Sequence, residues 1–277
     1  MTNRKVRGAL ITIIVLCIFA LTGCGMKSAQ TDDVLTQAQK ASENLKSYEA
    51  TSEASIRVGI KENPLVDMKL NSDIKVQTEP MLAYSKNKIK MKDQDTTMEM
   101  YLDKEKGYLN IPQSSQWYKI DTSDATYASL DQEQQTDPIK ALNLLKKYTD
   151  DMEMTSNKDN YEFHIKSEDG KMNDFIQDYL KEAMPVDQAQ ALGAVLDNLA
   201  IDTFDYTYKV DKKTYQPISS HLKLEASINV TGHKLDFIES MDSDYKNVNQ
   251  VTNLSIPDEV KTQAIPMPDD VMNGLSL

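Results

Sequence analysis

The stretch that decides the fold is Leu222-Lys-Leu-Glu-Ala-Ser-Ile-Asn-Val230, in which every second side chain is apolar. Successive side chains of a β-strand point to opposite faces of a sheet, so this alternation predicts a strand with one apolar and one polar face. Residues 204–210 repeat the pattern, with Phe, Tyr, Tyr and Val at alternate positions. Two such strands predict an antiparallel sheet whose apolar face must be covered.

The same alternation recurs on both sides of these two segments, separated by short clusters of Lys, Asp, Asn, Gly or Pro that are typical of turns. The further strands are expected at 54–60, 68–76, 81–91, 97–103, 107–111, 117–121, 152–155, 161–166 and 235–241, and in the segment that follows to Val251. The sequence therefore predicts about ten strands, and a sheet of that width usually curls.

Apolar residues recur at helical spacing in three regions outside the strands. An opening helix is expected over 32–48, a second over 136–148, and a helical hairpin over 171–200 whose first arm ends at Pro185. Their apolar stripes require cover, and the sheet supplies it. We therefore predict an α+β fold in which a curved antiparallel sheet, a half-barrel, wraps around an N-terminal helix and an inserted helical hairpin.

The first 23 residues have the build of a signal peptide. Three basic residues precede an apolar run from Ala9 to Leu21, and this run of about 13 residues is too short for a permanent membrane-spanning helix. Leu21-Thr22-Gly23-Cys24 resembles the bacterial lipobox, in which the cysteine receives diacylglycerol before cleavage. We expect Cys24 to be the lipidated first residue of a lipoprotein held on the extracytoplasmic face of the cell membrane. If the segment stayed uncleaved, the rest of the chain would still lie outside the membrane.

The predicted mature chain divides into a tether at 24–31, which is small and polar, and a single domain at 32–277. It keeps 28 Lys and Arg against 43 Asp and Glu, a formal net charge of -15, which argues against nucleic acid as a partner. A cationic partner fits this charge. The other cysteine, Cys17, lies within the signal peptide, so no disulfide is expected.

The sequence offers no arrangement typical of an enzyme. Its three histidines, His164, His221 and His233, show neither metal-ligand spacing nor a neighbouring cysteine, and we expect the first two to face solvent on strands. The acidic pairs Asp93/Asp95 and Asp242/Asp244 lack the glycine and distant glutamate of a calcium loop and are interpreted as solvated turns. We therefore expect no catalysis, no metal and no cofactor.

The lipobox, the opening helix, the long amphipathic strands, the inserted hairpin and the closing Ile256-Pro-Asp-Glu-Val260 together resemble the LolA/LppX-like superfamily of envelope lipoproteins. Uncharacterised Gram-positive lipoproteins share this plan. The resemblance implies a curved sheet wrapped around helices, with acyl chains of a lipid or of another lipoprotein sheltered between them. It implies a carrier or chaperone rather than an enzyme.

Methionines are frequent on the predicted strands, and flexible thioether side chains suit the wall of an adaptable apolar site. The candidate ligand-binding residues are Met98, Met100, Leu102, Met152, Met154, Phe175, Tyr179, Leu192 and Leu196. An ordinary packed core would use the same residue types. Two functions therefore stay open: binding of a lipid or acyl chain, and a solid-core module that recruits a protein partner at the cell surface.

Overall fold

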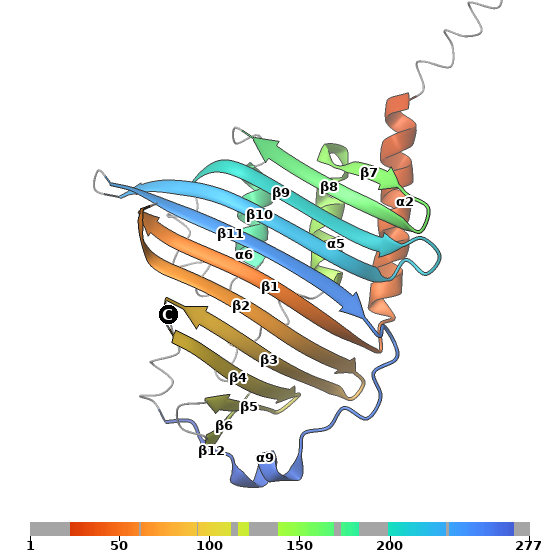
Figure 1. Ribbon diagram of the computed structural model, residues 1–277. Helices are drawn as coiled ribbons and strands as arrows, with labels where there is room; N and C mark the ends of the chain where they lie inside the picture. The colour runs from red at the N-terminus through yellow and green to blue at the C-terminus, as the bar shows by residue number, and fades with distance from the viewer. Residues whose placement is uncertain are drawn as a thin grey trace, which may run out of the picture.

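A computed structural model of the chain describes residues 23–60, 62–92, 94–111, 116–121, 138–168, 173–182, 199–230 and 233–268. It contains one strongly curved, open sheet (Figure 1). The sheet has 12 strands in the order β12-β6-β5-β4-β3-β2-β1-β11-β10-β9-β8-β7, so the predicted number of about ten was too low. The difference includes β12, a two-residue strand that carries no alternating pattern to detect.

The strands of the N-terminal half are β1 (Ser47–Ile60), β2 (Asn63–Thr78), β3 (Met81–Met91), β4 (Gln94–Asp103), β5 (Lys106–Ile111) and β6 (Gln116–Asp121). Those of the C-terminal half are β7 (Glu153–Ser156), β8 (Asn160–Glu168), β9 (Ala200–Asp211), β10 (Pro217–Val230), β11 (His233–Lys246) and β12 (Ile265–Pro266). The helices are α2 (Gly23–Glu43), α5 (Pro138–Lys147), the 3-10 turn η1 (Thr149–Asp151), α6 (Asn173–Glu182) and α9 (Asp258–Gln263).

The two halves of the sheet join where β1 pairs antiparallel with β11 at its centre. Ala54 lies opposite Met241, and Met241 lies opposite Leu222 of β10, so the apolar positions of consecutive strands fall on one face. We call this the inner face, because its residues pack with those of the helices. Every other strand pair except the parallel β12–β6 contact is antiparallel, as the sequence predicts.

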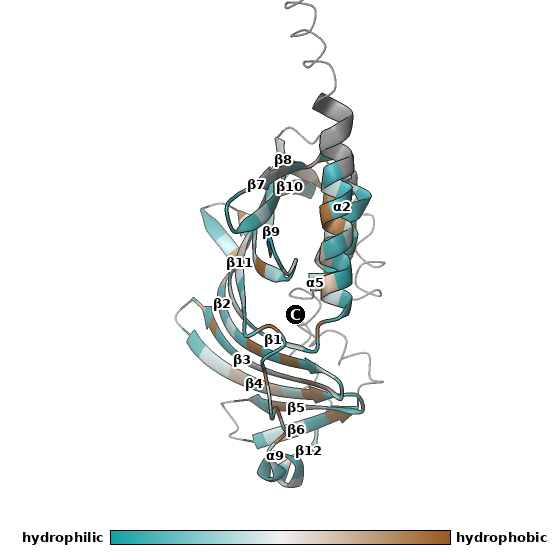
Figure 2. Ribbon diagram, turned by 90° about the vertical axis from the view of Figure 1, so that its right-hand side faces the viewer, coloured by the Kyte–Doolittle hydropathy of each residue, from teal (hydrophilic) through white to brown (hydrophobic). Residues whose placement is uncertain are grey.

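The helices α2 and α5 lie together on the concave side of the sheet (Figure 2). Leu142 and Leu145 of α5 are completely buried in the same core as Leu35 of α2, which explains the helical spacing of these leucines. From α6, Phe175 packs edge-on against Phe204 of β9, with ring centroids 5.2 Å apart. The C-terminal half of the sheet and the three helices thus form one core.

The opening helix differs from its prediction at both ends. Helix α2 begins at Gly23, so the structure is helical through the predicted tether, where residues 26–31 include neither Gly nor Pro to stop a helix. It ends at Glu43, and Tyr48 belongs to β1. Helix α6 confirms the first arm of the predicted hairpin; the second arm lies outside the described residues. Among the helices described, none has the length and hydropathy needed to cross a membrane.

Candidate functional site

A pocket of about 500 Å³ opens where the helices meet the start of β1. We call it the mouth pocket. Its walls come from the end of α2, the end of β2, the start of β3 and the first turn of α5. The lining residues are Ser42, Glu43, Asn44, Leu45, Lys46, Tyr48, Val76, Thr78, Glu79, Met81, Pro138 and Ile139. Three separate parts of the chain therefore build the pocket.

Hydrogen bonds fix the connection between α2 and β1 that forms the floor of this pocket. The Lys46 N–H donates to Asn249 Oδ1 at 2.7 Å, and the Lys46 carbonyl accepts from the Thr78 N–H at 2.9 Å. The Thr78 hydroxyl donates to the Leu45 carbonyl at 2.9 Å. Asn249 has a φ of +58°, a left-handed conformation that asparagine tolerates better than most residues. The floor is thus held by groups distant in sequence.

The mouth pocket combines buried apolar residues with exposed charged ones. Leu45, Tyr48 and Val76 are buried, whereas Glu43 and Lys46 are exposed. Such a pocket suits a ligand with an apolar body and a polar end, because the body is removed from water and the end stays hydrated.

Ser42 gives the pocket a hydrogen-bonding group. Ser42 is 1% exposed, and its hydroxyl has no hydrogen-bond partner among the described residues. An unsatisfied buried polar group costs about 1–3 kcal/mol.

The structure separates the predicted ligand-binding residues into two cores. Met98, Met100 and Leu102 share the inner face of β4 and pack in the N-terminal half of the sheet. Met152, Met154, Phe175 and Tyr179 pack in the core beneath the helices. None of these seven residues lines the mouth pocket. Leu192 and Leu196 lie outside the described residues, and Cys24 is in the first turn of α2.

Sequence reasoning missed the residues of the mouth pocket. Leu45 and Ser42 lie at a helix end, and Ile139 opens another helix about 90 residues later, so no periodic pattern connects them. Sequence reasoning also missed Glu239, an acid that lies between the apolar residues Phe237 and Met241 on the inner face of β11. Its position in the alternation was a usable signal.

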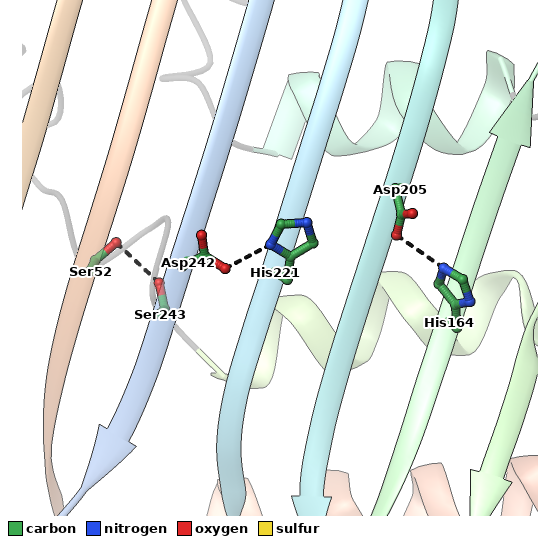
Figure 3. Close-up of polar contacts among 6 residues, drawn as sticks. All are labelled: Ser52, His164, Asp205, His221, Asp242 and Ser243. Atoms are coloured by element: carbon green, nitrogen blue, oxygen red, sulfur yellow. Dashed lines mark hydrogen bonds and ion pairs between the residues drawn. The ribbon is translucent and has the colours of Figure 1, made fainter.

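The outer face of the sheet carries two His–Asp pairs (Figure 3). His164 Nε2 lies 3.0 Å from Asp205 Oδ1, and His221 Nδ1 lies 2.7 Å from Asp242 Oδ1. Both histidine side chains are partly exposed, at 36% and 44%, which confirms the predicted solvent-facing positions. A shallow groove of about 300 Å³ beside His221 is lined by polar side chains, among them Lys209 and Asp242.

Ser243 does not complete a nucleophilic triad with His221 and Asp242. Ser243 follows Asp242 in sequence, but adjacent strand residues face opposite sides of the sheet, and Ser243 Oγ instead donates to Ser52 Oγ at 3.1 Å (Figure 3). Asp242 and Asp244 lie within β11, so their prediction as a solvated turn was wrong; the strand continues because Ser243 and Tyr245 keep the buried alternation. Among the described residues, no group of three His, Cys, Asp or Glu side chains is placed to hold a metal ion.

The comparison with family models matches residues 30–265 to DUF6612, a family of unknown function. The chain belongs to this family. The comparison with curated proteins gives no match.

Solved structures similar to this member of DUF6612 include the LolA/LppX-like proteins whose plan the sequence resembles. The lipoprotein LppX of Mycobacterium tuberculosis is 10% identical, with 82% of this chain and 99% of LppX covered and a TM-score of 0.42. LprF of Mycobacterium bovis is 10% identical over 83% of this chain and 97% of LprF, with a TM-score of 0.44. A LolA superfamily protein of Nitrosomonas europaea is 12% identical over 82% of this chain and 95% of its own, with a TM-score of 0.21.

Proposed function

We propose that this protein is a lipoprotein, anchored through diacylglycerol on Cys24 to the extracytoplasmic face of the cell membrane, that binds a lipid or an acyl chain in the mouth pocket. Its role is that of a carrier or chaperone, and no reaction is involved. The observation that supports it is the pocket itself, a space of about 500 Å³ lined by buried apolar and exposed charged residues. Binding sites for small apolar ligands have volumes of about 300–1,000 Å³.

The position of the pocket fits this function. The mouth pocket lies at the end of α2, and Cys24 lies at the beginning of the same helix. A helix rises about 1.5 Å per residue, so Ser42 is about 27 Å from Cys24 along the axis. Each methylene group of an acyl chain that is buried in the bilayer contributes about 0.8 kcal/mol, so the diacylglycerol anchor stays in the membrane. The anchor therefore keeps the pocket within about 27 Å of the bilayer surface.

A titration with a fluorescent fatty-acyl probe tests the proposal. The chain with Cys24→Ser, lacking residues 1–23, should bind the probe with a saturable signal. Ile139→Trp adds bulk inside the pocket and should weaken binding at least tenfold. Leu65→Trp adds the same ring at a site that is 70% exposed and should leave binding unchanged. Absence of saturable binding, or equal binding by both variants, would refute the assignment.

A second function is supported by the groove on the outer face. Its lining combines His221, Asp242 and Lys209 on rigid strands, which could recruit a protein at the cell surface. If the groove recruits a protein, the double variant Lys209→Ala/Asp242→Ala should no longer capture a partner from the host envelope. The unmodified protein should then show no binding of the acyl probe. The acyl titration therefore separates the two functions.

A further inference from the structure

Glu239 is the only Asp, Glu, Lys or Arg that is buried among the described residues, with 9% of its surface exposed. It lies on the inner face of β11, between Ile56 of β1 and Leu224 of β10. Phe237 and Met241 flank it along its own strand, and both pack against the core beneath the helices. No ion pair or hydrogen bond joins the Glu239 carboxyl to another described residue. An acid in such surroundings requires an explanation.

Among the described residues, the titratable group that interacts with Glu239 is the phenol of Tyr179. Tyr179 of α6 lies near enough to feel its charge, and Tyr206 of β9 lies next to Tyr179, with ring centroids 6.2 Å apart. Burial raises the pKa of both phenols, so both are neutral at physiological pH. Burial also raises the pKa of Glu239 to about 7. Its cross-strand neighbours Ile56 and Leu224 are apolar, and within the part of the chain that the structure describes no Lys or Arg is buried to offset the carboxylate.

The apolar wall next to Glu239 is only half-buried. This far wall comprises Ile56, Val58, Val66, Met68, Leu235 and Phe237, at the end of the sheet where β1 ends and β2 and β11 begin (Figure 1). The inner face elsewhere on these strands is buried, as at Tyr48, Val76 and Tyr245. Ile56 is eight residues from Tyr48 along β1, about 26 Å at the usual rise of a strand. The far wall is therefore distinct from the mouth pocket.

We infer that the far wall is a second binding site, for a cationic amphiphile whose protonated amine pairs with the Glu239 carboxylate while its alkyl chain covers the half-buried apolar side chains. The charge at the site selects the ligand class. A fatty acid would place a second negative charge beside the carboxylate, and an alcohol would leave it without a counter-charge. The net charge of -12 also attracts cations to the molecule.

Calorimetric titrations of the Cys24→Ser chain with dodecylamine, dodecanol and dodecanoate, each below its micellar concentration, test this inference. At pH 8 the amine should bind at least tenfold more tightly than the alcohol, and the acid most weakly. The preference for the amine should diminish at pH 6, because the carboxyl becomes protonated below a pKa of about 7.

Glu239→Gln keeps the size of the side chain and should abolish the preference for the amine while retaining the affinity for dodecanol. Glu239→Met serves the same purpose if the amide is poorly tolerated. Glu53→Gln, at an exposed position of β1, is the matched control and should retain the preference. Equal binding of amine and alcohol by the unmodified chain, or a preference that survives Glu239→Gln, would overturn the inference. Ile139→Trp should not affect amine binding, so failure of the mouth pocket and failure of the far wall give different results.

Discussion

Replacing Glu239 by Gln should stabilise the protein at pH 8 and have little effect at pH 5. Burial raises the pKa of Glu239 from its ordinary value of 4.5 to about 7, so the folded state favours the protonated carboxyl. The contribution of this group to stability is therefore fully present below pH 4.5 and is lost as the pH rises toward 7. A shift of this size corresponds to about 3 kcal/mol, most of which is lost between pH 5 and pH 8.

Urea unfolding of the Cys24→Ser chain at pH 5 and pH 8 measures this effect. The Gln variant cannot ionise, so at pH 8 its free energy of unfolding should exceed that of the parent by about 2–3 kcal/mol, and at pH 5 by less than about 1 kcal/mol. Glu53→Gln, which changes an exposed acid on the same sheet, should give no such difference. If the Glu239 variant were less stable than the parent at pH 8, the carboxylate would have a favourable partner and the reasoning would be wrong.

Four further outcomes are expected. Cys24→Ser should release the protein from the membrane fraction into the soluble extract, because the thiol is the predicted site of diacylglycerol. Phe204→Ala removes a completely buried ring and should lower the free energy of unfolding by about 3–5 kcal/mol in a urea titration. Ser42→Ala should raise the free energy of unfolding by about 1 kcal/mol, because a buried hydroxyl with no partner among the described residues is removed. Asp211→Ala should cost about 1 kcal/mol, because Asp211 Oδ1 accepts hydrogen bonds from the backbone of the β9–β10 turn.

Three of these changes have a matched control. Met26→Ser should leave the protein in the membrane fraction, and its release would show that the anchor does not depend on Cys24. Leu65→Ala, at a site 70% exposed, should cost far less than Phe204→Ala. Asp211→Asn retains an acceptor oxygen and should be less destabilising than Asp211→Ala. Equal effects within either pair would contradict the packing or the turn geometry described for these residues.

The alternating strands could be predicted from the sequence because each long strand shows one face to the core and one to water. The series Phe204, Tyr206, Tyr208 fixes the face of β9 without reference to any other strand, and the structure confirms it. Strand β12 could not be predicted, because two residues carry no period. The start of α2 was misplaced because small polar residues suit a tether and a helix equally well.

The candidate site could be predicted only in part, for a related reason. The composition indicated an apolar interior, but which side chains enclose a pocket depends on where Ser42, Val76 and Ile139 meet. These residues belong to α2, β2 and α5 and come together only when the helices pack on the sheet. Glu239 was accessible to sequence reasoning, since it occupies an inward position between Phe237 and Met241. An acid that breaks an apolar alternation is therefore informative even without a recognised motif.

The most direct test of the central claim is native mass spectrometry of the mature domain with Cys24→Ser, purified from its own host, followed by organic extraction and lipid analysis. Binding of an acyl ligand in the mouth pocket predicts a lipid in stoichiometric amount, which Ile139→Trp displaces and Leu65→Trp retains. A protein that carries no lipid, and takes up no added fatty-acyl probe, would contradict the claim and favour the outer-face interaction module.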